Sequence, residues 1–342
     1  MAGLRAVPLR IWPAVRRVGP SLLRLIAGAT VLWFLWRQLG GAPFKNGLSA
    51  VTWQAVVAAF TLTVLTTVCS AWRWRVVARA LGVDIGLPGA TCAYYRSLFL
   101  NSVLFGGVVG DVHRAVTHGR RAGDVVRGLR AVGWERLCGQ IVQAAVTAVV
   151  LLSVASPLTP VVPYLLAGVA GLAGCAVLIV RSAARRGGGS RLTRAARAVS
   201  ADLRHGLLAP DVWPQLVLAS VLVVAGHTAT FVIAARVAGS TAPLGELVAL
   251  LLVVQCVMVI PLSIGGWGLR EGAAAWAFGA AGFGAATGVT ASVLYAVLML
   301  IAVAPGAGLL LADAVRHLRS QGRPRKSRRA DPAPLTMEAL RG

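Results

Sequence analysis

Long apolar runs, separated by short stretches rich in arginine, make up most of this chain. Each run holds roughly the 20 residues that a helix needs to cross a hydrocarbon core about 30 Å thick. The sequence shows no series of alternating strands of about ten residues, which an outer-membrane barrel requires. The pattern predicts spanning helices over residues 21–39, 51–72, 131–153, 161–181, 212–235 and 286–313.

Glycine and charge interrupt two further apolar segments, residues 91–112 and 266–283. The apolar run 246–263 leads into the second of these and ends in Pro261 and a glycine cluster. Glycine lets a helix stop inside a protein, so that freed backbone groups can face a polar cavity. We expect helix breaks at Gly106, Gly107, Gly110, Pro261, Gly265, Gly266, Gly268 and Gly272.

The arginine clusters predict the topology, because positively charged loops stay on the cytoplasmic side of a membrane. Clusters precede the first span, follow the second and precede the span at 131–153, so the segment 91–112 must enter the membrane and return. The basic stretch 181–204 and the C-terminal tail are also expected to be cytoplasmic.

The same assignment of loops to the two sides of the membrane requires residues 246–283 to leave the outer face and come back to it as a broken hairpin. The chain then consists of two inverted halves, about 21–153 and 161–313, each with one broken element. Paired glycine-broken segments at corresponding positions of inverted halves mark the substrate site in transporters. A basic cytoplasmic segment, 1–20, precedes the halves, and a basic, disordered cytoplasmic tail, 314–342, is expected to follow them.

Composition agrees with a membrane protein. Of the 342 residues, 57% are hydrophobic and 13% are charged, and the mean hydropathy is +0.75, whereas soluble domains carry about a quarter charged residues. The net charge of +23 is divided among short clusters between apolar runs, which indicates topology signals and no nucleic-acid partner. The cysteines stand singly, and P-loop, GxSxG and HExxH motifs are absent, so we predict no metal, no cofactor and no catalytic residue.

The first broken element carries Asp111 and Arg114, which share a helix face because they are three residues apart. They either form an interfacial salt bridge or line a path for a lipid headgroup.

The second broken element places Arg270 and Glu271 between apolar runs, where charges are costly unless they face the bundle interior or water. If a half-helix begins near Gly268, its N-terminus and Arg270 favour an anion such as a lipid phosphate. Glu271 can pair with Arg270, bind a cationic headgroup or carry a proton. A purely structural buried ion pair is the alternative.

A third pair, Glu135 and Arg136, opens the span at 131–153 and is a candidate for the same path. The run Trp72 to Arg75 alternates tryptophan with arginine at the end of the second span, which is typical of an interfacial anchor. His227 is alone among apolar neighbours, and we expect it to form a hydrogen bond between helices. The predicted headgroup-binding residues are Asp111, Arg114, Glu135, Arg136, Arg270 and Glu271.

Four segments together resemble the lysylphosphatidylglycerol synthase membrane domain, also called the flippase-like domain family. They are WRWRVVARALG at 72–82, YRSLFLNSVLFGGVVGDVHRA at 95–115, WERLCG at 134–139 and IPLSIGGWGLREGA at 260–273. In that family the membrane domain is associated with moving an aminoacylated phospholipid between leaflets, and a soluble C-terminal domain performs the aminoacyl transfer. Because this chain ends at Gly342 after a basic tail, the resemblance implies a stand-alone member without the transferase domain.

We therefore expect an all-α polytopic protein of the inner or plasma membrane, with about 7–8 transmembrane helices plus re-entrant broken helices in two inverted repeats. The expected function is to bind and flip a phospholipid or related charged lipid, either anionic or aminoacylated. One alternative is a membrane-embedded transferase acting on a lipid or polyprenyl carrier. The other is a non-transporting partner of a cell-envelope biosynthesis enzyme, and a separate lipid-modifying enzyme is a candidate partner.

Overall fold

The computed structural model describes residues 30–104, 107–154, 157–161, scattered positions between 163 and 182, 198–258 and 266–321. Within this part of the chain the secondary structure is helical throughout, with no strand. Residues 30–39 are helical, and the further helices are α2 (Ala42–Ser49), α3 (Trp53–Ala80), α4 (Leu87–Val103), α5 (Val109–Arg121), α6 (Val125–Ser153), η1 (Thr159–Val161), η2 (Asp202–Leu207), α9 (Trp213–Val237), α10 (Leu244–Val257), α11 (Leu269–Ala280), α12 (Ala285–Ala302) and α13 (Pro305–Gln321).

Four helical stretches among the described residues are long and apolar enough to cross a bilayer. They are α3, α6, α9 and the stretch Ala285–Arg316, which α12 and α13 form together. The prediction of an all-α polytopic membrane protein is thereby confirmed. Residues 21–29 and most of the predicted span 161–181 lie outside the described residues.

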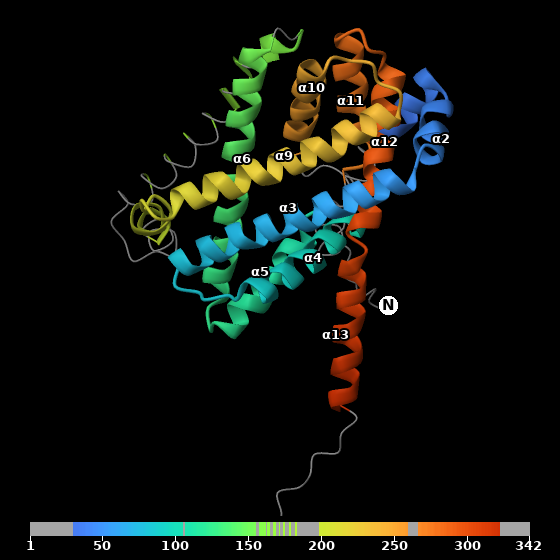
Figure 1. The fold of residues 1–342 in the computed structure, drawn as a ribbon. Helices are drawn as coiled ribbons and strands as arrows, with labels where there is room; N and C mark the ends of the chain where they lie inside the picture. The colour runs from blue at the N-terminus through green and yellow to red at the C-terminus, as the bar shows by residue number, and fades with distance from the viewer. Residues whose placement is uncertain are drawn as a thin grey trace, which may run out of the picture.

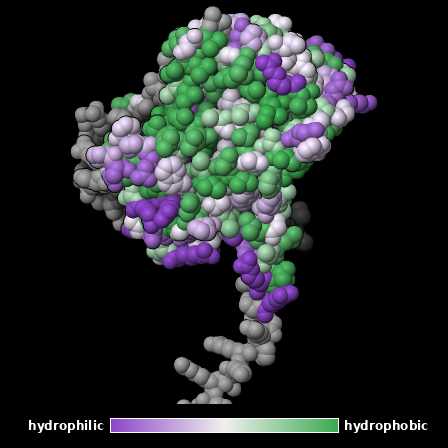
Figure 2. All heavy atoms as spheres, in the orientation of Figure 1, coloured by the Kyte–Doolittle hydropathy of each residue, from purple (hydrophilic) through white to green (hydrophobic). Residues whose placement is uncertain are grey.

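Helices α3 and α9 lie side by side across the middle of the molecule, and α6 and α12 pack against both of them (Figure 1). Small side chains allow this close contact, as is usual between helices in lipid. At Gly226 of α9, an added Cβ atom would collide with the Thr66 side chain of α3. Large apolar side chains point outward instead, and hydrophobic residues cover most of the face that Figure 2 shows.

Both predicted broken elements are pairs of short helices that pack against each other, α4 with α5 and α10 with α11. In Figure 1 the two pairs lie on opposite sides of the α3 and α9 layer. In the first pair, α4 ends at Val103 and α5 begins at Val109, and Gly107 between them has a φ of +60°. Before α11, Gly266 and Gly268 both have a φ of +86°, a region that favours glycine.

Several boundaries differ from the predicted ones. Helix α3 continues to Ala80, beyond the expected end at residue 72, because Arg73 and Trp74 are buried in the bundle. The predicted span 286–313 is interrupted at Val303 and Ala304, since Pro305 lacks the N–H that would continue the ladder.

The expectation of a disordered tail from residue 314 requires correction, because α13 continues to Gln321. This helix packs along α4. A Cβ atom at Gly306 would meet the backbone of Tyr95, and Asp313 pairs with Arg96 of α4 at 3.0 Å. These contacts stabilise the first half of the helix, and residues 322–342 lie outside the described part of the chain.

Candidate functional site

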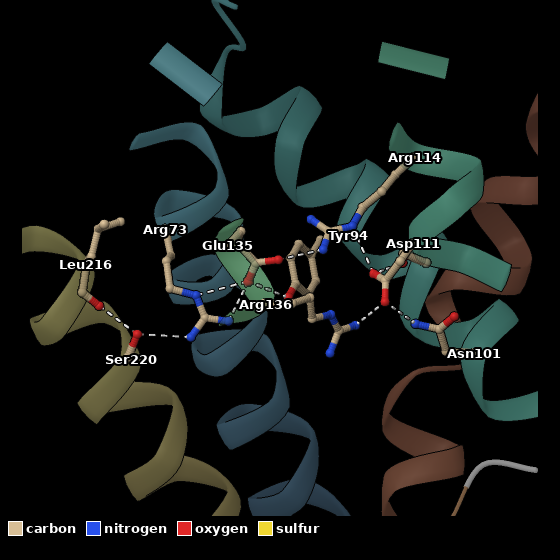
Figure 3. Close-up of polar contacts among 10 residues, drawn as sticks. Arg73, Tyr94, Asn101, Asp111, Arg114, Glu135, Arg136, Leu216 and Ser220 are labelled. Carbon is tan, nitrogen blue, oxygen red and sulfur yellow. Dashed lines mark hydrogen bonds and ion pairs between the residues drawn. The ribbon is translucent and has the colours of Figure 1, made fainter. Parts of the chain in front are cut away.

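A fully buried carboxylate, Glu135 of α6, joins four helices near the centre of the first half (Figure 3). Arg73 of α3 donates to its Oε1 from Nε at 2.9 Å and also through Nη2. Arg114 of α5 donates to its Oε2 at 2.6 Å, and the Tyr94 hydroxyl of α4 donates to Oε1 at 3.2 Å. A carboxylate without solvent contact is stable in the membrane interior only with such compensation.

Asp111 in the first turn of α5 is the second acceptor of the network (Figure 3). It accepts from Arg114 Nε at 3.0 Å and from Arg136 Nη2 at 2.6 Å. Ser97 and Asn101 of α4 also donate to it, at 3.0 and 3.2 Å. These bonds hold the two helices of the first broken element together next to the break.

Three guanidinium groups and two carboxylates therefore form one connected network, and its net charge is +1. Arg114 is enclosed, with its guanidinium carbon 4.3 Å from the Tyr94 ring centroid and 4.8 Å from that of Trp74. Arg136 differs, because its side chain is 40% exposed. Its Nε has no hydrogen-bond partner among the described residues.

The second half has a smaller polar cluster at the start of α11. Glu271 accepts from the Gly268 backbone N–H at 2.6 Å and from Arg270 Nη2 at 2.8 Å. Ser292 of α12 donates to Glu271 at 3.1 Å and accepts from Arg270 Nε at 3.1 Å. The positive end of this helix is thus already occupied by the protein's own carboxylate.

A cavity of about 310 Å³ lies between the two polar clusters. Arg73 and Arg136 line it from the first half, and Arg270 lines it from the second. Further polar groups in its wall are Thr63, Thr66, Thr67, Ser70, Tyr94, Gln140, Gln143, His227, Gln255 and Tyr295. The cavity is therefore rich in hydrogen-bond donors although its walls belong to membrane-spanning helices.

A second, apolar groove of about 510 Å³ lies between α6, α9 and α10. Valine, alanine, leucine and isoleucine form nearly all of its wall, and Thr228 is its one polar lining residue among those described. Val224 of α9 lines both the groove and the polar cavity. The polar and apolar spaces are therefore neighbours across a single side chain.

The structure divides the six predicted headgroup residues into two groups. Arg136 and Arg270 line the cavity. The remaining four are not among its described lining residues, and each forms at least one ion pair with another charged side chain of the two clusters. They are Asp111, Arg114, Glu135 and Glu271.

The Trp-Arg-Trp-Arg context predicts an interfacial anchor at Arg73, and for this residue the prediction is wrong. Arg73 and Trp74 are 6% and 1% exposed, and both face the bundle interior. The sequence signal for its true role is Glu135, a carboxylate in an apolar span that needs a cationic partner. His227 forms the expected bond between helices, since its Nδ1 lies 3.3 Å from the Tyr295 hydroxyl, and it also lines the cavity.

The described residues at which we predict helix breaks fall into two groups, those with positive φ and those that pack closely inside a helix. Gly107, Gly266 and Gly268 lie in the segments that precede α5 and α11, and each has a positive φ. Gly110 and Gly272 lie inside α5 and α11, so the prediction of a break at these two positions is wrong. Both serve close packing, because added Cβ atoms would meet the Ser97 backbone and Val31 respectively. Gly106, Pro261 and Gly265 lie outside the described residues.

Comparison with known proteins identifies the family of this chain. A search of curated proteins found no match. The family model described as the lysylphosphatidylglycerol synthase TM region matches residues 21–306, most of the chain and both polar clusters. The chain therefore belongs to the lysylphosphatidylglycerol synthase TM region family, a family of membrane domains associated with lipid handling.

Proposed function

We propose that this protein binds the headgroup of a charged lipid in the central cavity and moves the lipid between the leaflets of the bilayer. The observation that carries this proposal is the polar cavity between Arg136 and Arg270, next to an apolar groove that shares Val224 with it. A headgroup and an acyl chain joined in one molecule need this combination of adjoining spaces.

The barrier to lipid exchange is the transfer of a polar headgroup through hydrocarbon. Arginine, tyrosine, threonine and glutamine side chains in the cavity replace the hydrogen bonds that the headgroup gives up when it leaves water. The ionic partners Asp111 and Glu135 hold Arg136 and Arg73 in place. We assign these carboxylates, with Arg114 and Glu271, a positioning role behind the cavity wall.

The acyl chain belongs in the groove between α6, α9 and α10, whose wall matches a hydrocarbon tail. The two broken elements lie on opposite sides of the α3 and α9 layer (Figure 1). This placement supports two inverted halves with the cavity between them, the plan by which transporters alternate access. A protein of this plan belongs in the cell membrane with both termini cytoplasmic.

The test is lipid exchange in reconstituted phosphatidylcholine vesicles that contain a trace of headgroup-labelled phosphatidylglycerol, with dithionite bleaching the outer leaflet. The wild-type protein should expose label from the inner leaflet, and Arg136→Gln should slow this exchange by about tenfold, as the loss of one charge-assisted bond predicts. Arg127→Gln is the matched control, because Arg127 is an exposed arginine of the same helix.

The thermal unfolding of each variant in detergent separates loss of exchange from loss of fold. Equal exchange rates for wild type and Arg136→Gln, with both proteins folded, would contradict the proposed site. A chemically altered lipid in the same vesicles would indicate a transferase instead.

A further inference from the structure

We infer that the cavity selects a headgroup with net negative charge over an aminoacylated headgroup. The preferred headgroup is a phosphate that carries no amine. This inference rests on the proposed function and specifies its substrate class. It starts from the charge of the first network, in which Arg73, Arg114 and Arg136 meet only Asp111 and Glu135. One positive charge therefore has no counter-ion within the network.

That uncompensated charge is presented at the cavity by Arg136. Its Nη2 binds Asp111, and its Nε is buried without a partner among the described residues. Its side chain is 40% exposed and lines the cavity. A guanidinium that lines a cavity and is held by a single carboxylate favours an anion with several acceptor oxygens, and a phosphate diester has this chemistry.

The acidic residues of the chain leave no counter-charge for a cationic headgroup. The chain has eleven Asp and Glu residues, and only Asp331 and Glu338 lie outside the described residues, in the C-terminal tail. None of the remaining carboxylates is among the described lining residues of the cavity. The undescribed stretches between residues 30 and 321 contain no acidic residue.

Aromatic rings are the other common partners of an ammonium group. In the cavity wall, arginines already lie over Tyr94 and Tyr295, and the Phe231 ring stacks on Tyr295 with 4.5 Å between centroids. Arg114 lies over Tyr94 at 4.3 Å. Arg270 lies 5.5 Å from the Trp267 ring centroid and 5.6 Å from that of Tyr295. A lysyl headgroup would bring one or two ammonium groups beside these guanidiniums, and like charges at such distances repel strongly at low dielectric.

Binding of short-chain lipids to the purified protein in detergent tests the inference. The probes are dihexanoyl-phosphatidylglycerol, its lysyl ester and glycerol 1-phosphate, each titrated by calorimetry. We expect the anionic lipid to bind at least about tenfold more tightly than the lysyl ester. Glycerol 1-phosphate should bind more weakly than the anionic lipid, because it leaves the apolar groove empty.

A substitution that adds a carboxylate to the cavity wall provides a second test. Gln140 lines the cavity one helical turn beyond Arg136, so Gln140→Glu supplies the missing counter-charge and should remove the preference for the anionic lipid. Val126→Glu adds the same charge at an exposed position of α6 and should retain the preference.

Each outcome of these titrations has one meaning. Equal or tighter binding of the lysyl ester would overturn the inference while lipid binding itself still holds, as would an unchanged preference in folded Gln140→Glu. Binding of glycerol 1-phosphate as tight as that of the anionic lipid would identify a site for soluble phosphate and overturn the lipid assignment. Binding of none of the three probes would overturn the proposed function, and this inference with it.

Discussion

Arg114 Nη2 donates to Glu135 Oε2 at 2.6 Å, and neither side chain has any exposed surface. The pair joins α5 to α6, and Arg73 adds α3 through the other carboxylate oxygen. The stability of each buried charged side chain in this arrangement depends on its partners, because an unpaired ion in the membrane interior is costly.

Glu135→Gln should therefore destabilise the protein severely. The substitution keeps the shape of the side chain but leaves Arg73 without its only carboxylate among the described residues. Removing one partner of a buried pair costs about 3–5 kcal/mol, and we expect a correspondingly lower midpoint of thermal unfolding in detergent. Asp84→Asn, which removes an exposed carboxylate paired with Arg79, should leave the midpoint unchanged. Similar midpoints for both variants would show that the network contributes little to stability.

Arg73 and Arg75 provide a direct comparison within the tryptophan and arginine run of α3. Arg73→Gln removes bonds to Glu135 and Ser220, and each buried bond of this charged kind is worth about 1.5–3 kcal/mol. Arg75 forms no ion pair among the described residues, so Arg75→Gln should be tolerated. Urea-induced unfolding followed by tryptophan fluorescence distinguishes the two variants. Equal loss of stability would favour the anchor interpretation that the structure replaces.

Gly110→Ala should separate α5 from α4. The added methyl group would overlap the backbone of Ser97, which cannot move without disturbing the helix. Overpacking of this kind costs typically 1–3 kcal/mol. Gly133→Ala on α6 meets no atom within 4 Å and should instead raise stability slightly, as alanine favours a helix over glycine. Opposite shifts in the thermal midpoint are the expected result, and a shared direction would contradict this account.

Filling the apolar groove should block lipid exchange without disturbing the charges. Ala225 of α9 lines the groove, and Ala225→Trp places a large ring where we propose the acyl chain to lie. Leu218→Trp on the same helix is the control, because Leu218 is exposed and is not among the groove residues. The vesicle assay should show a several-fold slower rate for the first variant only. An unaffected rate in folded Ala225→Trp would remove the groove from the proposed path.

The sequence predicts the architecture well because its signals are local. Apolar runs give α3, α6 and α9 to within a few residues at most ends, and glycine next to charge marks both helix pairs. Arg136 and Arg270 are predicted at the site because charge within an apolar run is itself unusual.

The remaining features depend on contacts between distant segments. Whether an arginine at the end of a span faces lipid headgroups or the interior depends on the partner that it meets, and Glu135 lies 62 positions from Arg73. Gly110 and Gly272 could not be distinguished from true breaks, because close packing and chain reversal both select glycine. The apolar groove has no local signal, since its residues resemble those of any lipid-facing helix.

The position of Glu135 also constrains how the protein can move. Its side chain bonds directly to α3, α4 and α5 from α6, so these four helices should shift as one rigid body. The contact between α3 and α9 contains small side chains, which can slide without breaking an ion pair. Because α13 is tied to α4 by the Arg96 and Asp313 pair, any cycle of opening and closing should be a rocking of α9, α10, α11 and α12 against this fixed group, with Arg270 approaching and leaving a stationary Arg136.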